Sequence, residues 1–206
     1  MLKDWISSKY LANNKVNDFN RKFINAKPFS HVVLKEFFIK NKLKLVLNAL
    51  MKEEFTEKNS DLYQFKQTIN DIKSADNNLL YEFYLFFSSK EFLDYINKIT
   101  GIKINEIDMS GFIYGQSDYL LPHDDQLEGR KIAYVVNLSE KFTRKDGGRL
   151  QFFSTKDKKP FKTTKSYSPN FGNLVLFKVS DISFHQVEEV MSRKERISFA
   201  GWFHEH

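Results

Sequence analysis

The sequence contains no cysteine, and no part of it is apolar for long enough to cross a membrane. Without thiols the chain has no disulfide bond and no thiolate metal site, so any metal ion has to be held by histidine and carboxylate side chains. A membrane helix needs about 18 or more apolar residues. The first residues, MLKDWISSKYLANN, also lack an apolar run of signal-peptide length. We therefore expect a cytoplasmic protein without a membrane partner.

Length and composition are those of a globular protein with a sizeable core, because 41% of the 206 residues are hydrophobic. Lys and Arg number 32 against 26 Asp and Glu, and the net charge of +6 favours an acidic partner such as nucleic acid. The densest basic segment is STKDKKPFKTTKSY, residues 154–167. We interpret it first as a mobile surface loop and second as a docking surface. No recognised nucleic-acid motif is present, so we expect no sequence-specific nucleic-acid binding.

The spacing of apolar residues changes near residue 100. Before it, NKLKLVLNALMKEEF and LLYEFYLFFSSKEFLDYINKITG have helical spacing, with Gly101 ending the second, and Val32 and Val33 indicate an early strand. After it, short β-rich runs such as KIAYVVNLS, GNLVLFKVS and ERISFAGWF alternate with polar or glycine-containing joints. We predict one α+β domain, 1–206. Residues 1–100 supply mainly helical support, and residues 101–206 supply most of a double-stranded β-helix (jelly-roll) core.

A cluster of polar residues precedes one of these β-rich runs, in YLLPHDDQLEGRKIAYVVNLS, residues 119–139. His123, Asp124 and Asp125 there suit a polar turn, because His and Asp are common in turns. They also suit half of a metal site, since residues two apart on an extended chain point the same way, and His123 and Asp125 would then close on one ion. His185, after the apolar strand LVLFKV, is the candidate third ligand, although alone it equally fits a buried core histidine. Two imidazoles and a carboxylate form the facial triad of non-haem iron(II) oxygenases.

The segment RISFAGWF supplies a candidate anion site. Alternation along a strand puts Arg196, Ser198, Ala200 and Trp202 on one face. A guanidinium and a hydroxyl on one face can bind a carboxylate, whereas the alternative is an arginine in a surface ion pair at the barrel rim. The terminal His204 and His206 also lie two apart, and we interpret them as a solvated chain end.

Taken together, these motifs resemble a known enzyme family. The order His123, Asp125, His185 and Arg196 with Ser198 resembles the 2-oxoglutarate and iron(II) dependent oxygenases of the prolyl hydroxylase type. More narrowly, DMSGFIYGQSDYLLPHDDQLEGRKIAYVVNLS, GGRLQFF, VLFKVSDISFHQVEEV and RISFAGWFH resemble the catalytic domain of the ribosomal prolyl hydroxylases over about residues 20–206. The resemblance implies hydroxylation of a proline in a small-subunit ribosomal protein, with release of succinate and carbon dioxide.

The resemblance also implies the roles of individual residues. His123, Asp125 and His185 would bind Fe(II), and Arg196, with Ser198 beside it, would bind the distal carboxylate of 2-oxoglutarate. Tyr114 matches a family tyrosine that contacts this cosubstrate, although it also fits a core aromatic. The family's second cosubstrate tyrosine is replaced by Asn137, whose amide can donate a hydrogen bond without forming an aromatic wall.

The implied partners are dioxygen, a protein substrate and ascorbate as reductant. Eukaryotic members append a second, non-catalytic jelly roll. The sequence ends at His206, so we expect substrate docking to be achieved otherwise. Three alternatives remain open: an oxygenase of a free amino acid or small molecule, a non-catalytic jelly-roll binding module, and a basic nucleic-acid-binding protein.

Overall fold

The amphipathic helices expected in the first half of the chain are present, with one break. The computed structural model, which describes residues 1–205, divides LLYEFYLFFSSKEFLDYINKIT at Ser89 into α4 (Asn78–Ser88) and α5 (Lys90–Thr100). Ser89 has an extended conformation, and its hydroxyl accepts a hydrogen bond from the N–H of Phe92 at 3.3 Å. It therefore ends one helix and caps the next. Gly101 ends α5 in the left-handed conformation, with φ +69°, as its position predicted.

Most of the remaining helices lie before residue 105 in the sequence, and most strands lie after it. The other helical segments are α1 (Leu2–Trp5), η1 (Ser8–Tyr10), α2 (Asn13–Asn25), α3 (Lys40–Leu50), η2 (Ile72–Ser74) and η3 (Arg144–Asp146). The strands are β1 (His31–Leu34), β2 (Phe55–Ser60), β3 (Tyr63–Thr68), β4 (Glu106–Ile107), β5 (Ser110–Tyr114), β6 (Tyr119–His123), β7 (Arg130–Asn137), β8 (Leu150–Lys156), β9 (Lys159–Tyr167), β10 (Leu174–Lys178), β11 (His185–Val187) and β12 (Arg196–His204).

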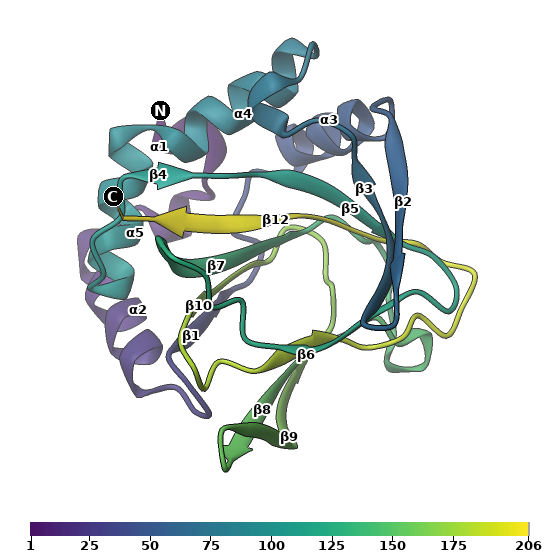
Figure 1. Cartoon of the computed structure of the whole chain (residues 1–206). Coiled ribbons are helices and arrows are strands. Elements are labelled where there is room, and N and C mark those ends of the chain that lie inside the picture. Colours follow the sequence, from purple (N-terminus) through teal and green to yellow (C-terminus); the bar gives the residue numbers. More distant parts are fainter. Residues whose placement is uncertain (206) are drawn as a thin grey trace.

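All strand pairs in the described residues are antiparallel, and they form a curled sheet in the order β1-β10-β7-β12-β5-β3-β6-β11-β8-β9. Strand β2 pairs with β3, and β4 pairs with β12. Figure 1 shows the helices along one side of this sheet, while the β8–β9 hairpin projects from the opposite side. The predicted class, α+β with a jelly-roll core and helices packed on it, is confirmed.

The aromatic residues hold the helices on the outer face of the sheet. Phe199 and Phe203 of β12 are fully buried against helices α4 and α5, whereas Ala200 and Trp202, on the other face of the strand, pack with a second apolar cluster. The alternation expected for β12 is therefore present. The helix side chains that complete the outer cluster include Trp5, Phe83, Phe86, Phe87, Phe92 and Ile96. Burial of rings of this size is the main stabilising term in such a core.

Two hairpins differ from the sequence-based expectation. The hairpin of β2 and β3 was not predicted, because FTEKNSDLYQFKQT is mostly polar and has only one partly buried face. Residues 154–167, expected to be a mobile loop, form most of the β8–β9 hairpin instead. There the turn uses positive φ angles at Asp157 (52°) and Lys158 (59°), which match the twist of the flanking strands. The strand expected at Val32 and Val33 is present as β1.

Candidate active site

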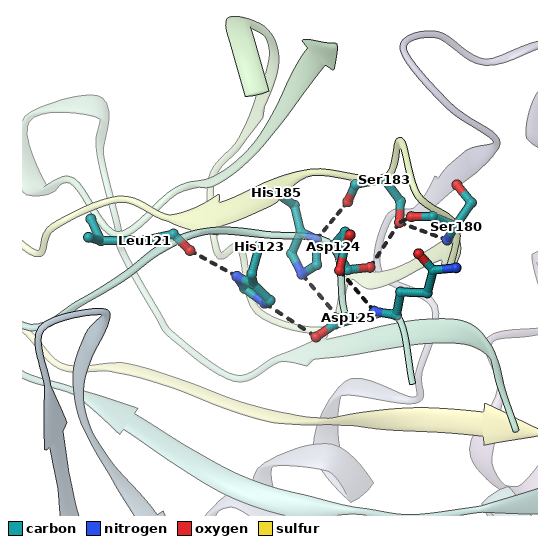
Figure 2. Close-up of polar contacts among 8 residues, drawn as sticks. Leu121, His123, Asp124, Asp125, Ser180, Ser183 and His185 are labelled. Carbon is teal, nitrogen blue, oxygen red and sulfur yellow. Dashed lines mark hydrogen bonds and ion pairs between the residues drawn. The ribbon is translucent and has the colours of Figure 1, made fainter. Parts of the chain in front are cut away.

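Two histidines meet because their strands are neighbours. His123 ends β6 and His185 begins β11, and the two residues are directly paired across these strands. Each ring has its Nδ1 close to a backbone carbonyl two residues earlier, at 2.8 Å from Leu121 O and 2.9 Å from Ser183 O. A carbonyl can only accept, so Nδ1 carries the proton in both rings and Nε2 presents its lone pair. Figure 2 shows both Nε2 atoms directed toward Asp125.

The carboxylate of Asp125 lies between the two rings. Its oxygens are 3.3 Å from Nε2 of His123 and 3.2 Å from Nε2 of His185. Burial alone would raise the pKa of the Asp125 carboxyl, but the adjacent imidazoles, when protonated at Nε2, donate to it and carry positive charge, which outweighs burial and holds that pKa well below its usual range. Asp125 is therefore ionised at neutral pH. Its backbone differs from the extended chain expected, because φ is +62° just beyond the end of β6.

Together the three side chains form a donor set suited to a metal ion. One ligand atom of each lies within 4.8 Å of the others. Two neutral imidazoles and one carboxylate on one side of an ion suit Fe(II) and leave further coordination positions open. The donor set therefore fits iron.

The residues next to this triad hold its backbone. The side chain of Asp124 turns away from the site and accepts a hydrogen bond from the N–H of Gln126 at 3.0 Å. Ser183 was not selected in the sequence analysis. Its hydroxyl lies 3.0 Å from the carbonyl oxygen of Asp124 and accepts a hydrogen bond from the N–H of Ser180 at 2.9 Å. It links the two segments that carry the ligands.

Arg196 begins β12 and is 2% exposed. Its NH1 donates to the hydroxyl of Ser198 at 3.2 Å, its Nε has no hydrogen-bond partner, and no carboxylate of residues 1–205 lies within ion-pair distance. Burial lowers the pKa of the Arg196 guanidinium, yet arginine remains charged at neutral pH. A buried charge of this kind is costly unless an anion accompanies it. The surface ion pair considered from the sequence is absent.

Tyr114 of β5 lies beside Arg196, whose guanidinium carbon is 5.0 Å from the centre of the tyrosine ring. Burial raises the pKa of Tyr114, so its hydroxyl stays protonated and can donate a hydrogen bond. Asn137 pairs with Ser198 across β7 and β12, but its amide lies 3.5 Å from the carbonyl oxygen of Asn173, and Asn137 does not line the adjoining cavity.

One cavity of about 580 Å³ connects the triad with the buried arginine. Tyr63 and Phe65 of the unpredicted hairpin contribute to its wall, and the ring of Phe65 is tilted against that of Tyr114 with ring centres 5.2 Å apart. These two aromatic residues lie two apart in DLYQFKQT, and this alternation was the sequence signal that could have indicated a strand with both rings on one face. The cavity is also lined by the triad and by the residues around the arginine: His123, Asp125, His185, Tyr114, Arg196 and Ser198.

His204 is not the solvated chain end that the sequence suggested. It is the last residue of β12, and its Nε2 lies 2.8 Å from Oδ2 of Asp108. The prediction was wrong because β12 stays paired with β7 as far as this residue, with a register shift between Phe203 and His204, and pairing fixes its position. His206 lies outside the described residues.

The fold and the site define a class of protein, and comparison with known sequences agrees. Residues 109–204 match the 2OG-Fe(II) oxygenase superfamily. This segment of the chain therefore belongs to the superfamily of 2-oxoglutarate and iron(II) dependent oxygenases.

Within that class, the similar curated proteins are prolyl hydroxylases. The chain is 35% identical over 196 residues to prolyl 3-hydroxylase OGFOD1 of Xenopus laevis, covering 93% of this chain and 38% of that protein. It is 32% identical to prolyl 3-hydroxylase sudestada1 of Drosophila melanogaster, covering 78% of this chain and 31% of that protein. The chain thus spans about a third of the length of these relatives.

Solved structures share the fold at low sequence identity. A Pseudomonas putida prolyl-4-hydroxylase has a TM-score of 0.73 at 15% identity, covering 91% of this chain and 99% of that one. A Trichoplax adhaerens prolyl hydroxylase, in complex with a peptide fragment of hypoxia inducible factor, has a TM-score of 0.72 at 16% identity, covering 96% and 93%. Among residues 1–205, no helix is long and apolar enough to span a membrane.

Proposed function

We propose that this chain is a 2-oxoglutarate and Fe(II) dependent dioxygenase that hydroxylates a prolyl residue of a protein. The observation that carries the proposal is one cavity with a His-Asp-His donor set and a buried arginine that has no carboxylate partner among residues 1–205. The first feature suits the metal, and the second suits an anionic cosubstrate. The names of the similar proteins support the prolyl target.

The metal would be held by His123, Asp125 and His185. When bound, iron together with 2-oxoglutarate supplies activation of dioxygen for insertion of one oxygen atom into a substrate C–H bond, with succinate and carbon dioxide as co-products. The protein's part is to present two Nε2 lone pairs and one charged carboxylate before the ion arrives. The hydrogen bonds at Nδ1 fix the ring orientation, which is the usual function of such outer contacts.

The cosubstrate would be oriented by Arg196, with its distal carboxylate on the guanidinium and on the hydroxyls of Ser198 and Tyr114. A bidentate pair between arginine and carboxylate is both strong and directional. The apolar wall formed by Phe65, Leu120 and other residues of this cavity keeps water from competing for these donors. We do not assign Asn137 to the cosubstrate, since its amide faces Asn173.

For the substrate we propose a proline of a small-subunit ribosomal protein. The proposal is supported by the motifs shared with the ribosomal prolyl hydroxylases and by the net charge of +6, which speeds encounter with a partner rich in RNA. A ribosomal substrate places the enzyme in the cytoplasm. We further propose that residues 1–206 act as one oxygenase domain, because one apolar cluster joins side chains from Trp5 to Phe203.

The test is a mass-spectrometric assay with purified protein, iron(II), 2-oxoglutarate and ascorbate. The substrates are a proline-containing peptide from the decoding-centre region of the ribosomal protein, the same peptide with alanine in place of proline, and free proline. We expect one added oxygen on the first peptide only, dependent on both iron and 2-oxoglutarate. Oxidation of free proline without modification of the peptide would instead establish a small-molecule oxygenase.

Two neighbouring carboxylates provide a matched pair of variants. Asp125→Asn removes the charge of one ligand and should abolish turnover. It should also weaken metal binding, because a site with few ligands depends on each of them. Metal binding is measured by calorimetry with Mn²⁺ as a redox-inert ion. Asp124→Asn should keep both, since an amide oxygen can still accept the hydrogen bond from Gln126. Equal loss in the two variants, or full metal affinity in Asp125→Asn, contradicts the assigned triad.

A further inference from the structure

The β8–β9 hairpin lies at the edge of the sheet, close to the triad. The sheet ends in the order β6, β11, β8, β9, and across these strands His185 pairs with Phe152, which pairs with Lys165. Neighbouring strands are about 4.8 Å apart, so the backbone of Lys165 lies roughly 10 Å from that of His185. From there the hairpin extends away from the barrel to its turn (Figure 1). A partner that binds this hairpin is therefore held at the edge of the sheet that carries His185.

The hairpin carries an unbalanced positive charge. Its exposed lysines are Lys156, Lys158, Lys159, Lys162 and Lys165, and Asp157 is the single acidic residue between them. None of these lysines forms an ion pair within the described part of the chain, residues 1–205. Charges that a protein leaves unpaired on one projecting element are available to a polyanion.

An exposed aromatic ring lies among these lysines. Phe161 is 65% exposed, and the Nζ of Lys156 is 5.7 Å from the centre of its ring. The register of the hairpin shifts at this point, since Ser154 pairs with Lys162 and Thr155 pairs with Pro160. Phe161 is thus the additional residue of a β-bulge, a feature that commonly redirects a side chain.

Lysines and a proline on an edge strand also prevent unwanted strand pairing. That role explains Pro160 and the charges but does not require an exposed phenylalanine. A ring surrounded by cations matches the surfaces that bind single strands of nucleic acid, where bases stack on aromatic side chains and phosphates contact lysine.

We propose that the tip of the β8–β9 hairpin binds single-stranded RNA without sequence preference, with Phe161 stacked on a base and Lys156, Lys158, Lys159 and Lys162 at phosphates. The choice of RNA as the polyanion rests on the proposed ribosomal substrate. The hairpin would then hold the enzyme on RNA next to the protein segment that enters the cavity.

The test is fluorescence anisotropy with a labelled twelve-nucleotide single-stranded RNA, measured without iron, 2-oxoglutarate or peptide. Four phosphate contacts predict that log Kd rises with log salt concentration with a slope of about +2.8, which is roughly 50-fold weaker binding at 200 mM than at 50 mM salt. Changing Lys156, Lys158, Lys159 and Lys162 to Gln should remove most of that dependence. Phe161→Ala should weaken binding about 5- to 150-fold, the range for loss of one stacked base.

A matched variant controls for net charge. Lys15, Lys22, Lys98 and Lys103 are exposed, lie on or next to α2 and α5, and form no ion pair among residues 1–205. Changing these four to Gln removes the same charge and should leave RNA affinity nearly unchanged. Equal weakening by the two quadruple variants, no effect of Phe161→Ala, or preference for duplex RNA or a poly-glutamate peptide over the single strand would each overturn the proposal. In the hairpin variants, we expect circular dichroism and turnover of the short peptide to stay at the parental level. These two measurements therefore separate failure of this inference from failure of the proposed oxygenase activity.

Discussion

Replacing Arg196 with methionine should stabilise the protein without ligand and remove most of its stabilisation by 2-oxoglutarate. The guanidinium is 2% exposed and has no carboxylate partner among the described residues, so the folded protein retains a desolvated charge that is not balanced. Methionine has a similar length and fills the space without a charge. Replacement of buried ion pairs by apolar side chains is neutral or stabilising by about 1 to 4 kcal/mol in other proteins, and Arg196 has no ion-pair attraction among the described residues that would offset its desolvation. For a chain of this size, each kcal/mol raises the melting temperature by about 2 to 4 °C.

2-Oxoglutarate should stabilise the parent protein more than the Arg196→Met variant. At a concentration of 100 times its Kd, 2-oxoglutarate should stabilise the parent by about 2.7 kcal/mol. Loss of one partner in a buried charge pair weakens binding by about 2 to 5 kcal/mol, so the same concentration should stabilise Arg196→Met by no more than about 0.9 kcal/mol. Arg196→Lys should recover only part of the affinity, because an ammonium group lacks the forked geometry.

Thermal melting with Mn²⁺ in the metal site, with and without 2-oxoglutarate, measures both effects. Arg149 provides the control, because its guanidinium already has a carboxylate partner in Glu188, with contacts of 2.6 Å from both Nε and NH2. Arg149→Met should lower the melting temperature and keep the full response to 2-oxoglutarate. The reasoning is refuted if Arg196→Met retains that response, or if it destabilises the unliganded protein as Arg149→Met does.

Three further predictions concern the scaffold. Burial lowers the pKa of His31 below its ordinary value of 6.5, so the unfolded chain binds the proton more readily than the folded protein does. Stability to urea should therefore fall as the pH drops below about 6.5, and His31→Gln should remove that part of the pH dependence. A Cβ at Gly201 would lie 2.2 Å from the carbonyl oxygen of Asp108, so Gly201→Ala should lose about 1 to 3 kcal/mol in urea unfolding, whereas Gly115→Ala, with its nearest neighbour at 3.6 Å, should not. Asn77 caps α4 through two N–H groups, and Asn77→Ala should lower the free energy of unfolding by about 0.5 to 2 kcal/mol; an unchanged value would show that the cap is dispensable.

Much of the fold could be predicted from the sequence because it follows from periodicity. Helical spacing predicted α3 and the region of α4 and α5, and alternation along RISFAGWF predicted which face of β12 carries Arg196. The break at Ser89 was missed because both helices continue the same apolar stripe, and only the backbone conformation separates them. Polar hairpins such as β2–β3 lack an apolar pattern on both faces and are stabilised by pairing with strands distant in sequence.

The candidate site was predicted with an incomplete physical reason. Spacing and family resemblance together selected His123, Asp125 and His185, and the structure brings them together. The expected cause, an extended chain that points both side chains of the HxD pair the same way, is wrong at Asp125, whose φ is +62°. The missing carboxylate partner of Arg196 could not be predicted either, because partners depend on which distant side chains the fold brings near.

The left-handed backbone of Asp125 restricts which amino acids evolution can use at this position. Among residues with a side chain, Asp and Asn adopt such a φ most readily, and longer side chains such as Glu do so rarely. An iron ion held at this site would, for its part, favour an anionic oxygen donor, which Asn and Gly lack. Only aspartate satisfies both demands, so the backbone and the metal would select the same amino acid independently. In a lineage that loses catalysis, we would expect substitution by Asn or Gly at position 125 first, because these residues preserve the left-handed backbone but do not supply a charged metal ligand.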